Sequence, residues 1–174
     1  MNKKPLVGIL MGSDSDYEIM VEAARALRQF DVPFEMTVSS AHRTPERTSR
    51  YVTTARDRGL KVLIAGAGAA AHLAGVMAAE TTLPIIGVPI DATSLNGLDA
   101  LLAMVQMPAG MPVATMAVGK AGARNAGILA VQMLSLEDAI LADKLAQFKI
   151  DMAAGVEEKA LKLEKRLAED FGDN

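Results

Sequence analysis

Cysteine and tryptophan are absent from the 174-residue sequence, and aromatic residues make up only 3% of it. Without cysteine, the chain can form neither disulfide bonds nor metal sites built on thiolates. Histidine is also scarce, because His42 and His72 are the only two. Since histidine is the side chain whose ordinary titration falls near neutral pH, these two residues are the first candidates for proton transfer.

No basic tract is present either, and the formal net charge is −3. A nucleic-acid partner is therefore not expected, because such proteins carry a clustered positive surface. What the sequence does have is 51% hydrophobic and 22% charged residues in a length typical of one domain. This composition indicates an ordered globular protein rather than a disordered chain.

Long apolar runs that would indicate a membrane protein are missing as well. The run Leu6–Met11 is too short to cross a bilayer and no cleavage-like site follows it, so neither a membrane span nor a signal peptide is expected. Residues 62–79 and 100–119 carry no charged side chain. The first is mostly glycine and alanine and the second contains two prolines, as in buried strand–turn–helix units. We expect a cytoplasmic protein without membrane contact.

Short apolar runs alternate with helical patterns along most of the chain. The expected strands are 6–11, 34–39, 61–65, 84–88 and 113–118, and the expected helices are 19–30, one beginning at 45 behind the N-cap Thr44, 70–80, 98–105 and 121–134. This alternation predicts an α/β fold of three layers, a doubly wound parallel sheet of the flavodoxin-like type. Residues 136–170 are expected to form a C-terminal helical tail, interrupted at Gly155, on a single domain covering 1–174.

Four unusual segments fall at the ends of expected strands: 12–16, 40–45, 66–72 and 89–97. Since ligands of doubly wound sheets bind beyond the carboxyl ends of the strands, these segments should converge on one site. His42 lies in a polar turn and is the expected proton-transfer residue. For His72, near the start of a helix, a ligand contact and a structural role are equally open.

The segment Gly12-Ser13-Asp14-Ser15-Asp16 combines hydroxyls with backbone N–H groups at a helix start, which suits an anion such as phosphate. An ordinary capped helix is the alternative interpretation. Because carboxylates repel phosphate, Asp16 is better suited to accept hydrogen bonds from sugar hydroxyls, while Arg43 supplies positive charge.

A second hypothesis comes from residues 66–71, which match the G-x-G-x-x-A dinucleotide fingerprint, with Asp91 about twenty residues further on. An NAD-binding or nucleotide-binding protein is therefore an alternative. The match is weakened by its place in the third strand–helix unit instead of the first, and by the alanine-rich context.

Taken together, the motifs resemble one family, the 5-(carboxyamino)imidazole ribonucleotide mutases of bacterial de novo purine synthesis. They span residues 6 to about 134 in order, with two departures, Ala74 in place of the usual proline and Asn96 in place of a small residue. The matching motifs are Met11-Gly12-Ser13-x-Ser15-Asp16, Ser40-Ala41-His42-Arg43-Thr44-Pro45, Ala65-Gly66-Ala67-Gly68-x-Ala70-Ala71-His72-Leu73-x-Gly75, Gly87-Val88-Pro89, Gly97-Leu98-Asp99, Val105-Gln106-Met107-Pro108-x-Gly110 and Asn125-Ala126.

The resemblance implies an isomerase that uses no cofactor and no metal, and that moves a carboxylate from the exocyclic amine to a ring carbon of its substrate. It implies His42 as the general acid and base, and 66–72 as the wall of a pocket that retains carbon dioxide. The substrate-binding residues it implies are Ser13, Ser15, Asp16, Ser40, Arg43, Gly68 and His72. It also implies a homo-octamer with active sites at subunit contacts. Direct carboxylation of aminoimidazole ribonucleotide, the reaction of animal-type relatives, is the nearest alternative.

Overall fold

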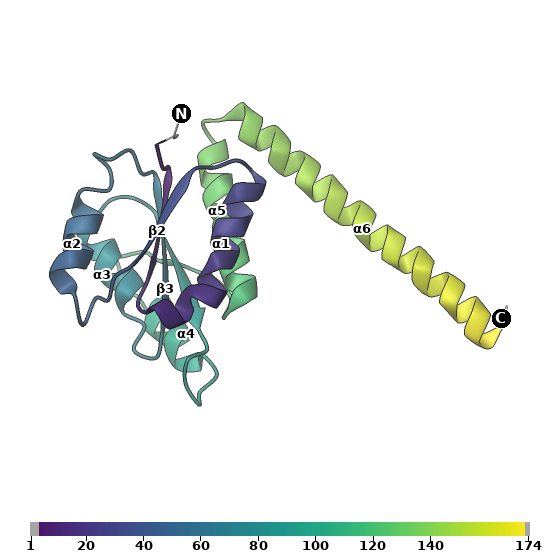
Figure 1. Ribbon diagram of the computed structural model, residues 1–174, viewed down its shortest axis with the longest axis horizontal. Helices are drawn as coiled ribbons and strands as arrows, with labels where there is room; N and C mark the ends of the chain where they lie inside the picture. The colour runs from purple at the N-terminus through teal and green to yellow at the C-terminus, as the bar shows by residue number, and fades with distance from the viewer. Residues whose placement is uncertain (1–3, 173–174) are drawn as a thin grey trace. The chain divides into compact units, whose positions relative to one another are not determined.

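The structure, a computed structural model, describes residues 4–172, and these divide into two compact units that meet between Leu134 and Ser135. The first unit is an α/β sandwich and the second is a long helix (Figure 1). The prediction of a single domain over 1–174 includes residues 1–3 and 173–174, which lie outside the described part, and it stays a prediction.

The first unit is built on a five-stranded sheet in which all neighbouring strands are parallel and lie in the order β2-β1-β3-β4-β5. The strands are β1 (Val7–Met11), β2 (Phe34–Val38), β3 (Val62–Gly68), β4 (Ile85–Ile90) and β5 (Ala114–Thr115). The strand order reverses between β1 and β3, because β2 pairs with the other side of β1. Such a switch point leaves a crevice at the carboxyl ends of the two central strands.

Helices cover both faces of the sheet (Figure 1). They are α1 (Tyr17–Gln29), α2 (Pro45–Thr53), α3 (Leu73–Glu80), α4 (Leu98–Val105) and α5 (Lys120–Ser135), with a 3-10 turn η1 (Asp14–Asp16) before α1. Side chains of α2, α3 and α4 share one core cluster on one face. On the other face, Gly127 of α5 lies directly against Ala23 and Ala26 of α1. The predicted three-layer, doubly wound fold is confirmed.

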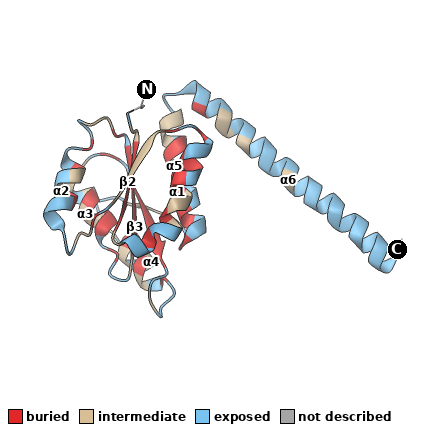
Figure 2. Ribbon diagram, viewed as in Figure 1, coloured by how far each residue is buried: buried red, intermediate tan, exposed pale blue. Residues whose placement is uncertain are grey.

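The core lies where the sequence has its continuous apolar runs. Every residue of β1 and β4, and all of β3 except Gly68, is buried, as the red sheet of Figure 2 shows. A strand covered by helices on both faces excludes water from both its sides, which is why these runs do not alternate with polar residues. The turns at the carboxyl edge are therefore attached to strands that are buried from solvent.

The expected elements are present, with shifted boundaries. β3 continues to Gly68 and α3 begins only at Leu73, so residues 69–72 form a turn at the sheet edge. β5 is only two residues long. The structure also locates the two residues that depart from the family pattern. Ala74 is a buried residue of α3, and Asn96 has a φ of 50°. Asparagine is among the residues that tolerate this left-handed conformation best.

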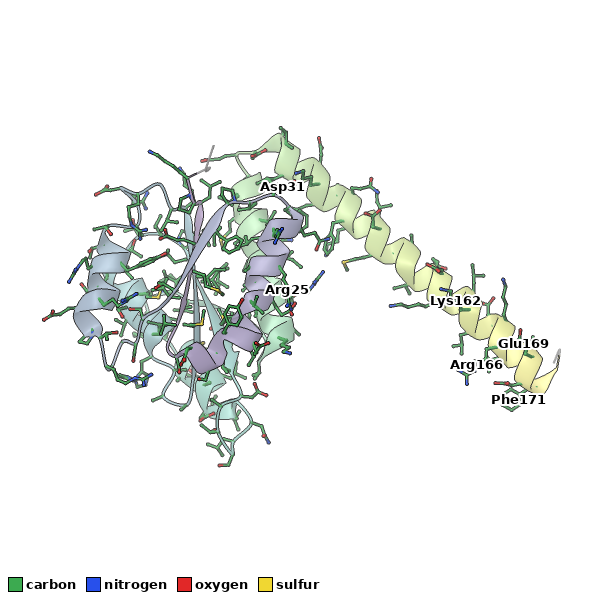
Figure 3. The ribbon with its side chains drawn as sticks, in the orientation of Figure 1. Arg25, Asp31, Lys162, Arg166, Glu169 and Phe171 are labelled. Carbon is green, nitrogen blue, oxygen red and sulfur yellow. The ribbon has the colours of Figure 1, made fainter. Side chains whose placement is uncertain are left out.

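The second unit consists mainly of α6 (Ala139–Phe171), which is continuous through Gly155. The predicted interruption at Gly155 is therefore wrong, since one glycine costs a helix only about 1 kcal/mol. The side chain of Asp138 caps the helix by accepting from the backbone N–H groups of Ile140 and Leu141. Figure 3 shows charged and apolar side chains projecting around its C-terminal part. Within residues 4–172, no helix combines the length and apolar character needed to cross a membrane.

Candidate active site

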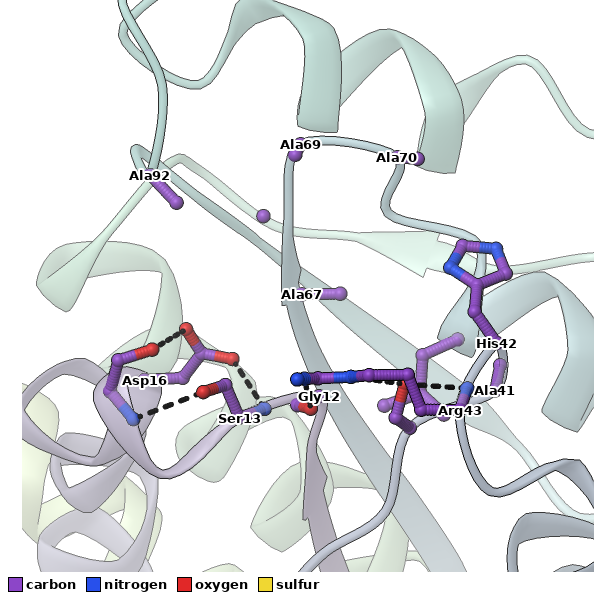
Figure 4. A pocket seen from close by; sticks show the side chains of 14 residues that line it. Gly12, Ser13, Asp16, Ala41, His42, Arg43, Ala67, Ala69, Ala70 and Ala92 are labelled. Atoms are coloured by element: carbon purple, nitrogen blue, oxygen red, sulfur yellow. Dashed lines mark hydrogen bonds between the residues drawn. The ribbon is translucent and has the colours of Figure 1, made fainter.

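A pocket of about 330 Å³ opens at the carboxyl edge of the sheet, at the switch point between β1 and β3 (Figure 4). The turns after β1, β2, β3 and β4 all contribute to its wall, so the predicted convergence of the four segments is confirmed. The wall is formed by Gly12, Ser13, Ser15, Asp16, Ser40, Ala41, His42, Arg43, Ala67, Gly68, Ala69, Ala70, Leu73 and Ala92.

The loop after β1 is folded by its own polar side chains. Asp16 accepts a hydrogen bond from the backbone N–H of Ser13 at 3.1 Å, and the Ser13 hydroxyl accepts one from the N–H of Ser15 at 3.4 Å. This reciprocal capping box starts η1. The Asp16 side chain is buried, and this burial raises the pKa of its carboxyl above the ordinary value although hydrogen bonds from Ser13 and Ser15 and the charge of Arg43 oppose the shift. The capped-helix interpretation of the segment is confirmed. The capped turn also lines the pocket, and binding of an anion there stays a prediction.

The turn after β2 is closed by Ser40 and Thr44. The Thr44 hydroxyl accepts from the backbone N–H of Ser40 and donates to the Ser40 carbonyl, both at 3.0 Å. Thr44 does occupy the N-cap position of α2, but its side chain bonds backward to this turn and not forward into the helix. The Ser40 hydroxyl accepts from the backbone N–H of Arg43 at 3.2 Å. Figure 4 shows the two side chains leaving this turn in different directions, Arg43 toward Gly12 and His42 away from it.

Arg43 and His42 each contact a different part of the site. The Arg43 guanidinium donates to the carbonyl of Gly12 at 3.0 Å, which joins the turn after β2 to the loop after β1. His42 contacts the other histidine: its Nε2 lies 2.9 Å from Nδ1 of His72. The site therefore has a permanent positive charge at one end and a pair of imidazoles at the other.

The remaining wall has no charged side chain. It consists of alanines and Gly68 from the end of β3 and the following turn, together with Leu73 and Ala92. A Cβ on Gly68 would lie 2.5 Å from the Cβ of Ala92, so only glycine fits there. Ala69 has a φ of 53°, a left-handed conformation that is uncommon outside glycine. Small side chains and a strained turn leave an apolar hollow of limited size.

Seven of the eight residues expected at the site line this pocket; His72 does not, although it contacts His42. Sequence reasoning missed Ala92 as an individual wall residue. It also missed Arg47, which lines an adjoining depression with Arg43 and donates to the Thr37 hydroxyl. Among residues 4–172, no three histidine or acidic side chains gather as a metal would require, and independence of metal stays a prediction.

The fold and the pocket define a doubly wound α/β protein with a candidate ligand site at its switch point, where a histidine and an arginine line the same pocket. A family model described as AIR carboxylase matches residues 6–155. The N5-carboxyaminoimidazole ribonucleotide mutase of Pyrococcus horikoshii is 54% identical over 164 residues, 94% of this chain and 92% of that protein. The mutase of Bacillus subtilis is 60% identical over 142 residues, 82% and 88% of the two chains. The crystal structure of Treponema denticola PurE matches with a TM-score of 0.82 at 29% identity, covering 91% of this chain and 98% of that one.

These similarities extend over nearly the whole first unit and into α6. The chain belongs to the AIR carboxylase family. The family resemblance derived from the motifs is thereby confirmed.

Proposed function

We propose that this protein is an isomerase of purine biosynthesis that converts 5-(carboxyamino)imidazole ribonucleotide into 4-carboxy-5-aminoimidazole ribonucleotide. The observation that carries the proposal is the meeting of His42, Arg43 and an uncharged wall in one pocket. The mutase names of relatives that are 54% and 60% identical support the same reaction.

His42 is the general acid and base of this mechanism. As the bond between the carbamate carbon and the exocyclic nitrogen breaks, its imidazolium donates a proton to that nitrogen and carbon dioxide is released. Carbon dioxide then forms a bond to the ring carbon, and the neutral imidazole takes the proton that this carbon loses. His42 regains in the second step the proton that it gave in the first. The proposed reaction therefore uses neither a metal nor a cofactor.

The polar residues of the pocket hold the ribonucleotide. Arg43 and the hydroxyls of Ser13, Ser15 and Ser40 bind the phosphate, and Asp16 accepts from the ribose hydroxyls. The Arg43 guanidinium already lies 3.0 Å from the Gly12 carbonyl, so the anion would join an existing polar cluster. The wall at Gly68 and its alanine neighbours retains carbon dioxide, which is small and uncharged and needs no polar partner. His72 contacts His42 from outside the pocket wall.

Assembly into a homo-octamer with active sites at subunit contacts is part of the proposal. α4 follows the loop that supplies Ala92 to the pocket, and its side chains Leu98, Leu102 and Val105 are all about half exposed. Exposed apolar side chains in a row are typical of a surface that another subunit covers. We place the protein in the cytoplasm, with a small-molecule substrate and without nucleic-acid or membrane partners.

Direct carboxylation of aminoimidazole ribonucleotide remains the second candidate, because the matching family model is described as AIR carboxylase. A mutase must recapture the carbon dioxide it releases, so its pocket stays closed between the two steps. The test is to supply the carbamate substrate together with labelled bicarbonate and to analyse the earliest product. We expect almost no label in it and slow carboxylation of free aminoimidazole ribonucleotide. Rapid and full labelling would establish the carboxylase instead.

An NAD site at residues 66–71 is not favoured. Most of this stretch belongs to the end of β3 and the turn that walls the pocket, and α3 begins only at Leu73. A thermal shift with NADH but not with aminoimidazole ribonucleotide would reverse this assignment.

A further inference from the structure

His72 is absent from the pocket wall, yet its ring is held against the residue assigned to proton transfer. Its Nδ1 lies 2.9 Å from Nε2 of His42. The two rings meet edge to face, with centroids 5.0 Å apart and an interplanar angle of 87°. A nitrogen–nitrogen distance of 2.9 Å is that of a hydrogen bond, so one of the two atoms carries a proton and the other accepts it.

This contact limits the protonation of the pair. If both imidazoles were cationic, Nε2 of His42 and Nδ1 of His72 would each carry a hydrogen and would repel one another. The hydrogen bond therefore exists only while the pair holds no more than one extra proton. Other charged groups near the pair are few: Arg43 follows His42 on the same turn, Asp16 faces it from the loop after β1, and α3 has no charged residue before Glu80.

The contact also divides the two nitrogens of His42 between two tasks. Nε2 is engaged by His72, whereas Nδ1 has no hydrogen-bond partner within residues 4–172. In a histidine, the group bound at one nitrogen determines the tautomer and the orientation of the other. We propose that His72 is a positioning residue that holds His42 through Nε2 and so leaves Nδ1 to exchange protons with the substrate. This inference rests on the proposed function, and it replaces a direct substrate contact for His72.

Two substitutions of His72 separate this role from simple packing. In His72→Asn the amide can place a donor or acceptor where Nδ1 stood, whereas in His72→Gln it lies one methylene further, near the former Nε2. We expect His72→Asn to keep most of the turnover. We expect His72→Gln to lower kcat by about tenfold or more, the size typical of residues that orient a reacting group, with KM within about threefold of the parent. Equal kcat in the parent and both variants would overturn the proposal.

A spectroscopic test is independent of activity, because the chain has only two histidines to observe. In protein labelled with 15N-histidine, we expect scalar coupling across the hydrogen bond between Nε2 of His42 and Nδ1 of His72, and we expect this coupling to be lost in acid that protonates both rings. Absence of this coupling throughout the pH range would contradict the pairing. If the pair is observed but the parent protein does not isomerise the carbamate, the proposed function fails and the pairing stands.

Discussion

The guanidinium of Arg43 donates a hydrogen bond of 3.0 Å to the carbonyl oxygen of Gly12, a residue 31 positions earlier in the chain. The two residues belong to loops after different strands, β2 and β1, which pair in parallel with Met11 opposite Val38. Because both strands end at the same edge, the contact joins the two loops at the arginine end of the pocket. Arg43 thus has two roles, joining the loops and supplying charge.

These two roles lead to a prediction for Arg43→Ala. Binding of the ribonucleotide should weaken by roughly 10- to 100-fold, since a hydrogen bond to a charged group contributes about 1.5–3 kcal/mol. Binding of the phosphate-free riboside should change far less, as isothermal titration calorimetry would show. Arg56→Ala is the matched control, because Arg56 lies away from this pocket and donates a hydrogen bond to the Thr82 hydroxyl. Equal weakening of nucleotide and riboside would mean that Arg43 only holds the loops.

His42→Asn should abolish turnover while binding of the ribonucleotide persists. Loss of general acid and base catalysis typically costs about 10²- to 10⁴-fold in rate, and the substitution leaves the proposed phosphate contacts of Arg43 and Ser13 in place. Steady-state kinetics and equilibrium binding measured on the same preparation would separate the two effects. Activity within threefold of the parent would remove His42 from the mechanism.

Gly68→Ala tests the uncharged wall. The added methyl would lie 2.5 Å from the Cβ of Ala92 and 3.1 Å from the carbonyl oxygen of Ile90, so the end of β3 must move into or away from the pocket. Overpacking of this kind costs about 1–3 kcal/mol, and we expect a lower melting temperature together with reduced kcat. Gly155→Ala is the matched control, since nothing lies within 4 Å of the added atom. A fully active and fully stable Gly68→Ala variant would contradict the packing described for this wall.

Asp16 should make stability depend on pH in the acid range. Burial raises the pKa of its carboxyl in the folded protein above the ordinary value of 3.8, so between these two values the folded state binds more protons than the unfolded state. The contribution of this group to the free energy of unfolding therefore falls as the pH rises through that window. Relative to the parent, Asp16→Asn should become more stable as the pH rises, which melting temperatures at fixed protein concentration would measure. A stability difference that is constant or decreases with rising pH would refute the shift.

Assembly is tested by light scattering. We expect a symmetric homo-oligomer, eight subunits in the proposal, because α4 exposes Leu98, Leu102 and Val105 and single domains seldom leave such rows uncovered. Leu102→Glu should shift the mass toward smaller species. A parent protein that is monomeric at micromolar concentration would contradict both the assembly and the sharing of active sites.

Much of this structure follows from local sequence patterns. Apolar runs such as Val7–Met11 and Ile85–Ile90 identify buried parallel strands, because a strand covered on both faces must be apolar throughout. The strand-end rule then places Ser13, His42 and Gly68 at one edge before any coordinates are known. Gly155 shows the limit of such reasoning, since glycine lowers helix stability by an amount that the rest of a 33-residue helix can offset.

The sequence by itself determined the alternation of elements, the edge at which the site lies and seven of the residues that line it. Tertiary structure alone decided which of these residues touch. His42 and His72 are 30 positions apart, and no local pattern relates them, because their contact depends on the strand order that places β3 beside β1 and the turn after β2 across from it. The hydrogen bond between Arg43 and Gly12 arises in the same way. Distances of about 3 Å between segments far apart in the chain are set by how strands pair and helices pack, whereas sequence patterns report only on neighbours along the chain.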